Sequence, residues 1–164
     1  VELAHKFGTP LYVIDEATVR KNCRKFLTTM SSNYKDSKVI FASKALNCLE
    51  MCRVVTDEGL GLDVVSAGEL YTAIKAGVNP SDIYFHGNNK TPDELAMAVE
   101  NGVGRIVVDN LTELKMLNEI AKQAGKPLEG RDYYFFIDDY IGTFIILGAM
   151  AFKITETSIR LLKI

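Results

Sequence analysis

The sequence contains no tryptophan, two histidines and three cysteines among its 164 residues. The cysteines, Cys23, Cys48 and Cys52, are few and odd in number, which argues against a disulfide framework. A metal site would need more ligands than these cysteines with His5 and His86 provide. We therefore expect reduced thiols, no metal centre and a cytoplasmic protein.

Neither sign of charge dominates, because 19 basic and 21 acidic residues are interspersed and the formal net charge is −2. Nucleic-acid-binding domains carry a basic face, so nucleic acid is not an expected partner. The most apolar run, residues 143–152, is well short of the roughly 20 residues that a membrane-spanning helix needs. The sequence predicts no membrane partner and no signal peptide. Because the chain begins with Val1 rather than methionine, we expect it to start inside a longer protein or to have been processed.

Strand-like and helix-like segments alternate along the chain up to about Gly125. A short strand is predicted over residues 11–14 and a helix over 17–26. The repeating part that follows has predicted strands at 38–42, 62–65, 83–85 and 106–108, and predicted helices at 46–58, 68–76, 92–100 and 111–124. These strands are continuous apolar runs, which is typical of strands buried on both faces and hence of a parallel sheet covered by helices.

The starts of two helices are marked by polar capping residues. Thr91 is an expected N-cap with Glu94 three residues later, and Asn110 is another with Glu113 at the same spacing. In this spacing the glutamate side chain returns to the backbone N–H of the cap residue.

Two α/β folds fit this alternation, the (β/α)8 barrel and the doubly wound sheet. The doubly wound nucleotide fold would show a Gly-x-Gly-x-x-Gly turn after its first strand, whereas the sequence here reads Ala42-Ser43-Lys44-Ala45. The predicted fold class is therefore α/β, a partial (β/α)8 TIM-type barrel of about four β-α units. A short N-terminal strand precedes it and an unmatched C-terminal tail follows.

Functional side chains of a parallel barrel lie at the carboxyl ends of its strands. Lys44 follows an apolar strand, where desolvation would favour a neutral, nucleophilic amine; the alternative is a solvated loop lysine. Asp63 interrupts an apolar strand and needs a partner, for which Lys44 is the natural candidate; the alternative is an N-cap or a structural ion pair. His86 could stack on a flat ring or donate a hydrogen bond, or be a packed histidine at a strand end.

Five motifs in the right order resemble the ornithine, diaminopimelate and arginine decarboxylase family. They are FGTPLYVID at 7–15, FASKA at 41–45, LDVVSAGEL at 62–70, HGNNK at 86–90, and VVDN at 107–110 followed by Glu113-Leu114. The fourth motif usually reads Ala-Asn-Pro-x-Lys in the ornithine and arginine decarboxylases, so the resemblance favours the diaminopimelate branch.

This resemblance implies an alanine-racemase-like barrel followed by a β-domain, working as a homodimer with pyridoxal 5'-phosphate as cofactor. It implies that Lys44 holds the cofactor covalently and that Asp63 pairs with or orients Lys44, both being catalytic. Ala42 and His86 are implied to lie at the cofactor together with Lys44 and Asp63. The implied reaction is decarboxylation of meso-2,6-diaminopimelate, a small amino acid, to L-lysine and CO2 in lysine biosynthesis.

The resemblance ends near residue 126, where the β-α rhythm is also lost. Residues 133–137 are a strand-like aromatic run, and the apolar residues 141–154 fit helix and strand equally. We expect residues 1–126 to be the N-terminal half of the pyridoxal-phosphate-binding barrel domain. Residues 127–164 are expected to be an unmatched tail arising from a frameshift, a fusion or a mistaken gene boundary. Half a barrel is also expected to leave the fourth strand with an open edge.

Several functions stay open on this basis. The leading one is a truncated diaminopimelate decarboxylase whose parent is active and which binds the cofactor weakly, because the expected phosphate loop is missing. The alternatives are a non-catalytic barrel fragment kept for folding or assembly, an ornithine- or arginine-type decarboxylase, and a pyridoxal-phosphate carrier protein.

Overall fold

One parallel sheet organises the computed structural model, which describes residues 1–126 and 133–135. Its strands are β1 (Ile40–Ala42), β2 (Gly61–Val64), β3 (Ile83–Phe85), β4 (Arg105–Val108) and β5 (Tyr133–Phe135). They pair in the order β1-β2-β3-β4-β5, so each strand lies beside the next one along the chain. This order is that of a (β/α)8 barrel, since a doubly wound sheet reverses direction at a switch point. The predicted partial barrel is confirmed.

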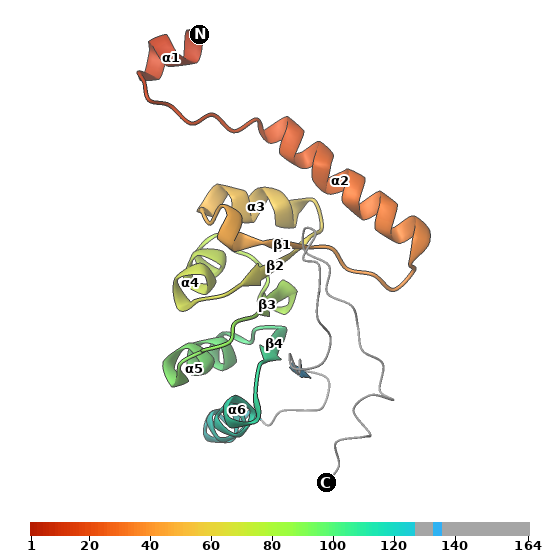
Figure 1. Ribbon diagram of the computed structural model, residues 1–164, viewed down its shortest axis with the longest axis vertical. Helices are drawn as coiled ribbons and strands as arrows, with labels where there is room; N and C mark the ends of the chain where they lie inside the picture. The colour runs from red at the N-terminus through yellow and green to blue at the C-terminus, as the bar shows by residue number, and fades with distance from the viewer. Residues whose placement is uncertain (127–132, 136–164) are drawn as a thin grey trace.

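Four helices, lying in a row along one side of the sheet (Figure 1), connect the first four strands and follow the last of them. They are α3 (Leu49–Asp57), α4 (Ala67–Lys75), α5 (Pro92–Asn101) and α6 (Leu111–Gln123). The strand side chains beneath them are buried: Leu62, Val64, Ile83, Phe85, Ile106 and Val108. The intervening residues of the same strands, such as Asp63 and Tyr84, are only partly buried. The strands thus alternate between buried and partly buried side chains, and the expectation that they are buried on both faces is wrong for the residues that the structure describes.

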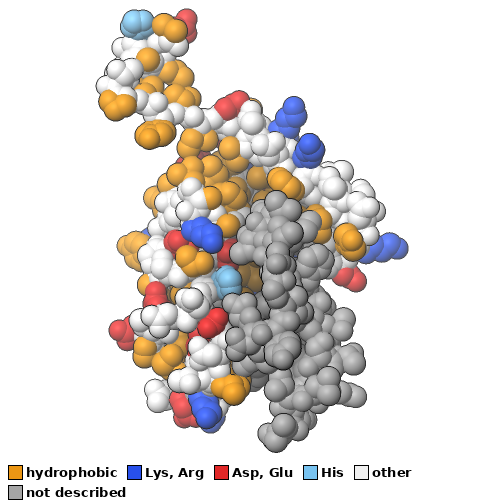
Figure 2. All heavy atoms as spheres, viewed as in Figure 1, with side chains coloured by type: hydrophobic (Ala, Val, Ile, Leu, Met, Phe, Trp, Pro, Cys, Tyr) orange, Lys and Arg blue, Asp and Glu red, His pale blue; other side chains and the backbone are white. Residues whose placement is uncertain are grey.

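The N-terminal segment differs from the sequence-based expectation. Helix α1 (Glu2–Phe7) and the residues after it project away from the sheet (Figure 1), and residues 11–14 form no strand. A strand is stable only beside a partner strand, and none of the described strands pairs with these residues. Their side chains are exposed, and apolar groups gather along this projecting segment (Figure 2).

Helix α2 (Glu16–Asn33) confirms the helix predicted over 17–26 and extends it. Its N-cap is Asp15, whose carboxylate accepts a hydrogen bond from the backbone N–H of Thr18. Its buried residue Cys23 belongs to the hydrophobic core cluster, and α2 packs against α3. Cys23, Cys48 and Cys52 are all free thiols. Within the described residues no helix has both the length and the apolar character needed to cross a bilayer.

Strand β5 extends the sheet beyond the fourth unit. Ile106 lies opposite Tyr133 and Val108 opposite Phe135 in a parallel ladder. The strand predicted over 133–137 is confirmed for 133–135, and the expected open edge on β4 is wrong. The other predicted element of the tail, residues 141–154, lies outside the described residues.

Three glutamates occupy the same place in successive units, the third position of helices α4, α5 and α6. In each helix the cap residue accepts a hydrogen bond from the glutamate's backbone N–H, and the pairs are Ser66 with Glu69, Thr91 with Glu94 and Asn110 with Glu113. We call Glu69, Glu94 and Glu113 the rim glutamates, because their side chains lie at the carboxyl-end rim of the sheet.

The rim glutamates also reach the β-α connection of the preceding unit. Glu69 Oε2 accepts hydrogen bonds from Ser43 Oγ and from the backbone N–H of Val65, each at 2.8 Å. Glu94 Oε1 accepts one at 3.0 Å from the backbone N–H of Ala67. The Glu69 contacts connect the loop after β1 to the loop after β2, and the Glu94 contact connects the start of α4 to α5.

The third rim glutamate forms a buried ion pair. Lys90 Nζ lies 2.7 Å from Glu113 Oε1, and the two side chains are 1% and 4% exposed. The same ammonium donates hydrogen bonds to the carbonyl oxygens of Gly87, at 2.6 Å, and Val107, at 2.7 Å. Glu113 therefore does not complete the capping box that its spacing after Asn110 predicted, whereas Glu94 does so after Thr91.

Replacing Lys90 by methionine should lower the free energy of unfolding by about 3–5 kcal/mol, because Glu113 would be left as a buried, unpaired charge. Urea unfolding of the chain and its variant measures this loss. The matched control is Lys122→Met, whose ion pair with Glu119 is exposed and should contribute less than about 1 kcal/mol. Equal losses for the two variants would contradict the importance of the buried pair.

Candidate active site

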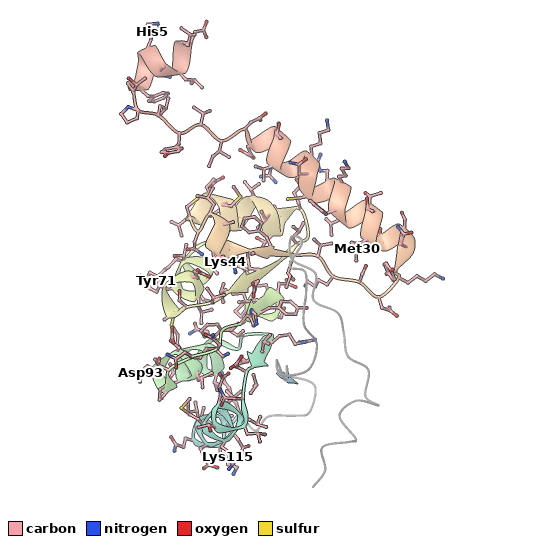
Figure 3. All side chains as sticks on the ribbon, viewed as in Figure 1. His5, Met30, Lys44, Tyr71, Asp93 and Lys115 are labelled. Atoms are coloured by element: carbon pink, nitrogen blue, oxygen red, sulfur yellow. The ribbon has the colours of Figure 1, made fainter. Side chains whose placement is uncertain are left out.

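Lys44 lies directly after β1, in the short 3-10 helix η1 (Ser43–Ala45), where the chain turns toward α3 (Figure 3). The turn closes through a hydrogen bond from the backbone N–H of Leu46 to the carbonyl oxygen of Ser43, at 3.0 Å. Ser43 is fully buried, whereas Lys44 is exposed. The expected partial burial of Lys44 is therefore wrong, and its amine is open to a ligand.

Asp63 lies on β2 opposite Ala42 of β1 in the parallel register. Burial raises the pKa of Asp63, and the charges of His86 and Lys44 lower this pKa in part. The negative charge of Glu69 adds to the increase. The structure thus brings Lys44, Asp63 and His86 within electrostatic reach of one another at the ends of three neighbouring strands.

His86 follows β3, and its backbone N–H donates a hydrogen bond to the carbonyl oxygen of Val64, at 2.8 Å. The exposed His86 and Lys44 line the same hollow, of about 520 Å³, together with Asn88, Asn89 and Asp109. Lysine, imidazole, amide and carboxylate groups from separate β-α loops therefore face one space. Such a space can receive a polar small molecule.

The loop after β3 is shaped by Gly87, whose φ of 138° is one that other residues rarely adopt. Lys90 also borders the hollow, but its ammonium is already shared among two carbonyl oxygens and Glu113. Of the polar residues that follow β3, Lys90 therefore supports the loop, and His86, Asn88 and Asn89 are the ones open to a ligand.

Sequence reasoning missed Glu69 and Ser43. Ser66 and Glu69 have the spacing of a capping box, which gives Glu69 a sufficient local explanation at the start of α4. Its carboxylate instead contacts Ser43, which is 26 residues earlier in the chain. The only available signal was the repetition of this cap-to-glutamate spacing in three successive units.

A family model described as the pyridoxal binding domain of pyridoxal-dependent decarboxylases matches residues 16–129. The diaminopimelate decarboxylase of Bacillus subtilis (strain 168) is 46% identical over 127 residues, which are 77% of this chain and 29% of that protein. The enzyme of the same name from Halalkalibacterium halodurans is 48% identical over 123 residues, 75% of this chain and 28% of that protein. The chain thus spans less than a third of these curated relatives.

Solved structures give the same relationship. The diaminopimelate decarboxylase from M. jannaschii in complex with L-lysine has a TM-score of 0.70 and 36% identity, covering 82% of this chain and 31% of that one. The Helicobacter pylori enzyme complexed with L-lysine has a TM-score of 0.67 and 30% identity, covering 76% and 31%.

The family match contains every β-α loop that contributes to the hollow, from Lys44 to Asp109. The resemblance carried by the five sequence motifs is therefore confirmed. The family's cofactor is pyridoxal phosphate and its members are carboxy-lyases. This chain belongs to the pyridoxal-dependent decarboxylase family, as part of its pyridoxal-binding domain.

Proposed function

We propose that this chain is part of a diaminopimelate decarboxylase that converts meso-2,6-diaminopimelate to L-lysine and CO2, and that Lys44 is its cofactor-binding lysine. The observation that carries the proposal is that Lys44 and His86 line one hollow, and that the charges of both act on Asp63 at the end of the strand between them. Its support is the 46% and 48% identity to curated diaminopimelate decarboxylases. The solved relatives that hold L-lysine support an amino acid as the small-molecule ligand.

The described residues fit pyridoxal phosphate. The cofactor is an aldehyde on a flat pyridine ring, and the exposed amine of Lys44 opens onto the hollow where such an aldehyde would bind. Ala42, at the end of β1, lies opposite Asp63 in the parallel register. When bound, the cofactor supplies an electron sink for the carbanion that loss of CO2 leaves behind.

The chain's own residues would divide the remaining work. Lys44 binds the cofactor, and Asp63 orients the Lys44 amine through its charge. Burial raises the pKa of Asp63, so its carboxyl group can hold or release a proton close to the amine at a higher pH than an exposed aspartate. His86 borders the same hollow and would contact the cofactor from the loop after β3.

The domain division is part of the same proposal. We assign residues 1–126 to the N-terminal half of the barrel domain, and residues 127–164 to a tail of different origin. The parent enzyme would act in the cytoplasm as a homodimer. The support is the match of residues 16–129 to the family model and the small share of each relative that the chain spans.

Incubation of this 164-residue chain with pyridoxal phosphate followed by borohydride should leave one reduced adduct on Lys44, located by peptide mass spectrometry. Lys44→Ala should remove the adduct, because no other exposed amine lies beside both Asp63 and His86 among the described residues. The matched control Lys75→Ala, at the exposed end of α4, should label normally. Labelling that persists in Lys44→Ala would contradict the assignment.

Asp63→Asn should raise the melting temperature of the cofactor-free chain at pH 7. The folded-state pKa of Asp63 lies above its ordinary value of 3.8. At a pH above the folded-state pKa the charged carboxylate therefore lowers the free energy of unfolding, and below about pH 3.8 this loss disappears. The gain in melting temperature should therefore shrink as the pH falls toward 4. Asp36→Asn, at an exposed loop position, should show no such trend. A melting temperature lowered at pH 7 by Asp63→Asn would contradict the assigned cost.

A further inference from the structure

Glu69 is the rim glutamate whose contacts adjoin the Lys44 turn. Its Oε2 accepts two hydrogen bonds. One comes from the hydroxyl of Ser43, the residue before Lys44, and the other from the backbone N–H of Val65, two residues after Asp63. A single carboxylate oxygen therefore joins the turn that carries the amine to the strand end that carries its acidic neighbour.

This contact is not explained by the needs of α4 itself. The Ser66 hydroxyl already accepts the backbone N–H of Glu69, at 3.3 Å, and so caps the helix. In the next unit, by comparison, Glu94 returns to its own cap residue, accepting the backbone N–H of Thr91 at 2.9 Å. Ser43 is fully buried, so its hydroxyl would lack a partner if the Glu69 carboxylate were removed.

We propose that Glu69 is a positioning residue for Lys44, holding Ser43 and Val65 so that the Lys44 turn and the Asp63 strand end keep one fixed arrangement. This inference rests on the proposed role of Lys44 as the cofactor-binding lysine. Glu69 acts through Ser43 and Val65, and no contact between Glu69 and the cofactor is required.

The charge of Glu69 adds a second effect at the same place. Among the described residues, the charged groups that act on Asp63 are His86 from the end of β3, Lys44 from η1 and Glu69 from α4. Glu69 raises the pKa of Asp63 while the other two lower it. Removing the charge but keeping the hydrogen-bond acceptor, as in Glu69→Gln, should therefore lower the pKa of Asp63 and leave the Lys44 turn in place.

Two readouts on the 164-residue chain need no cofactor. The pKa of Asp63 is measured by carbon NMR of its carboxyl group, with the signal assigned by its loss in Asp63→Asn. Opening of the Lys44 turn is measured by hydrogen exchange of the Leu46 amide, which closes that turn. A third readout is the rate at which Lys44 takes the borohydride-fixed label from pyridoxal phosphate.

Glu69→Ala should speed Leu46 exchange and slow Lys44 labelling, each by about tenfold, because the turn loses its anchor. Glu69→Gln should retain the wild-type Leu46 exchange rate and lower the pKa of Asp63; it keeps the test open if Glu69→Ala does not fold. Glu94→Ala removes the equivalent side chain of the next unit and is the matched control. It should leave Leu46 exchange and the Asp63 pKa unchanged.

An unchanged Leu46 exchange rate in Glu69→Ala, or equal effects of Glu94→Ala, would overturn the positioning role, and an unchanged Asp63 pKa in Glu69→Gln would overturn the charge effect. A wild-type chain that takes no label on Lys44 would instead refute the proposed function, while the titration and exchange measurements would still decide the role of Glu69.

Discussion

The rim glutamates tie each β-α loop of the half-barrel to the next, and the arrangement of the candidate site depends on these contacts. A parallel sheet holds its strands by backbone ladders, but the loops at the strand ends have no ladder of their own. Glu69, Glu94 and Glu113 supply the missing connections by bonding to Ser43 and Val65, to Ala67, and to Lys90. Lys44, Asp63 and His86 all lie on or beside loops that are fixed in this way.

Fixing the rim has an energetic cost that the core offsets. Lys90 and Glu113 are buried charges, and the carboxyl group of Asp63 is desolvated enough to raise its pKa. Burying such groups costs free energy, and the burial of apolar side chains offsets that cost. Leu62 and Phe85 of the strands and Leu95 and Leu117 of α5 and α6 are fully buried. Charge is thus concentrated at the carboxyl-end rim, where a parallel barrel carries its chemistry.

Much of the fold could be predicted from local sequence. Apolar runs gave the strands, and Thr91 with Glu94 marked the start of α5, because the information that fixes these features lies within a few residues. The failures involve partners distant in the chain or outside the described part. Residues 11–14 have strand-like composition but no described partner strand. Glu113 has capping-box spacing, but Lys90 takes its carboxylate. Lys44 was identified at the correct strand end, but its exposure depends on how the turn after Ser43 packs.

The arrangement of the site rests on one condition, that the rim glutamates hold the loops at the strand ends in place. Hydrogen exchange of the Val65 and Ala67 amides tests it most directly, because both donate to rim glutamates rather than to a neighbouring strand. Under this condition, these two amides exchange as slowly as those within β2 and β3. Exchange as fast as that of the exposed loop residues Asn88 and Asn89 would show an open rim and contradict the claim.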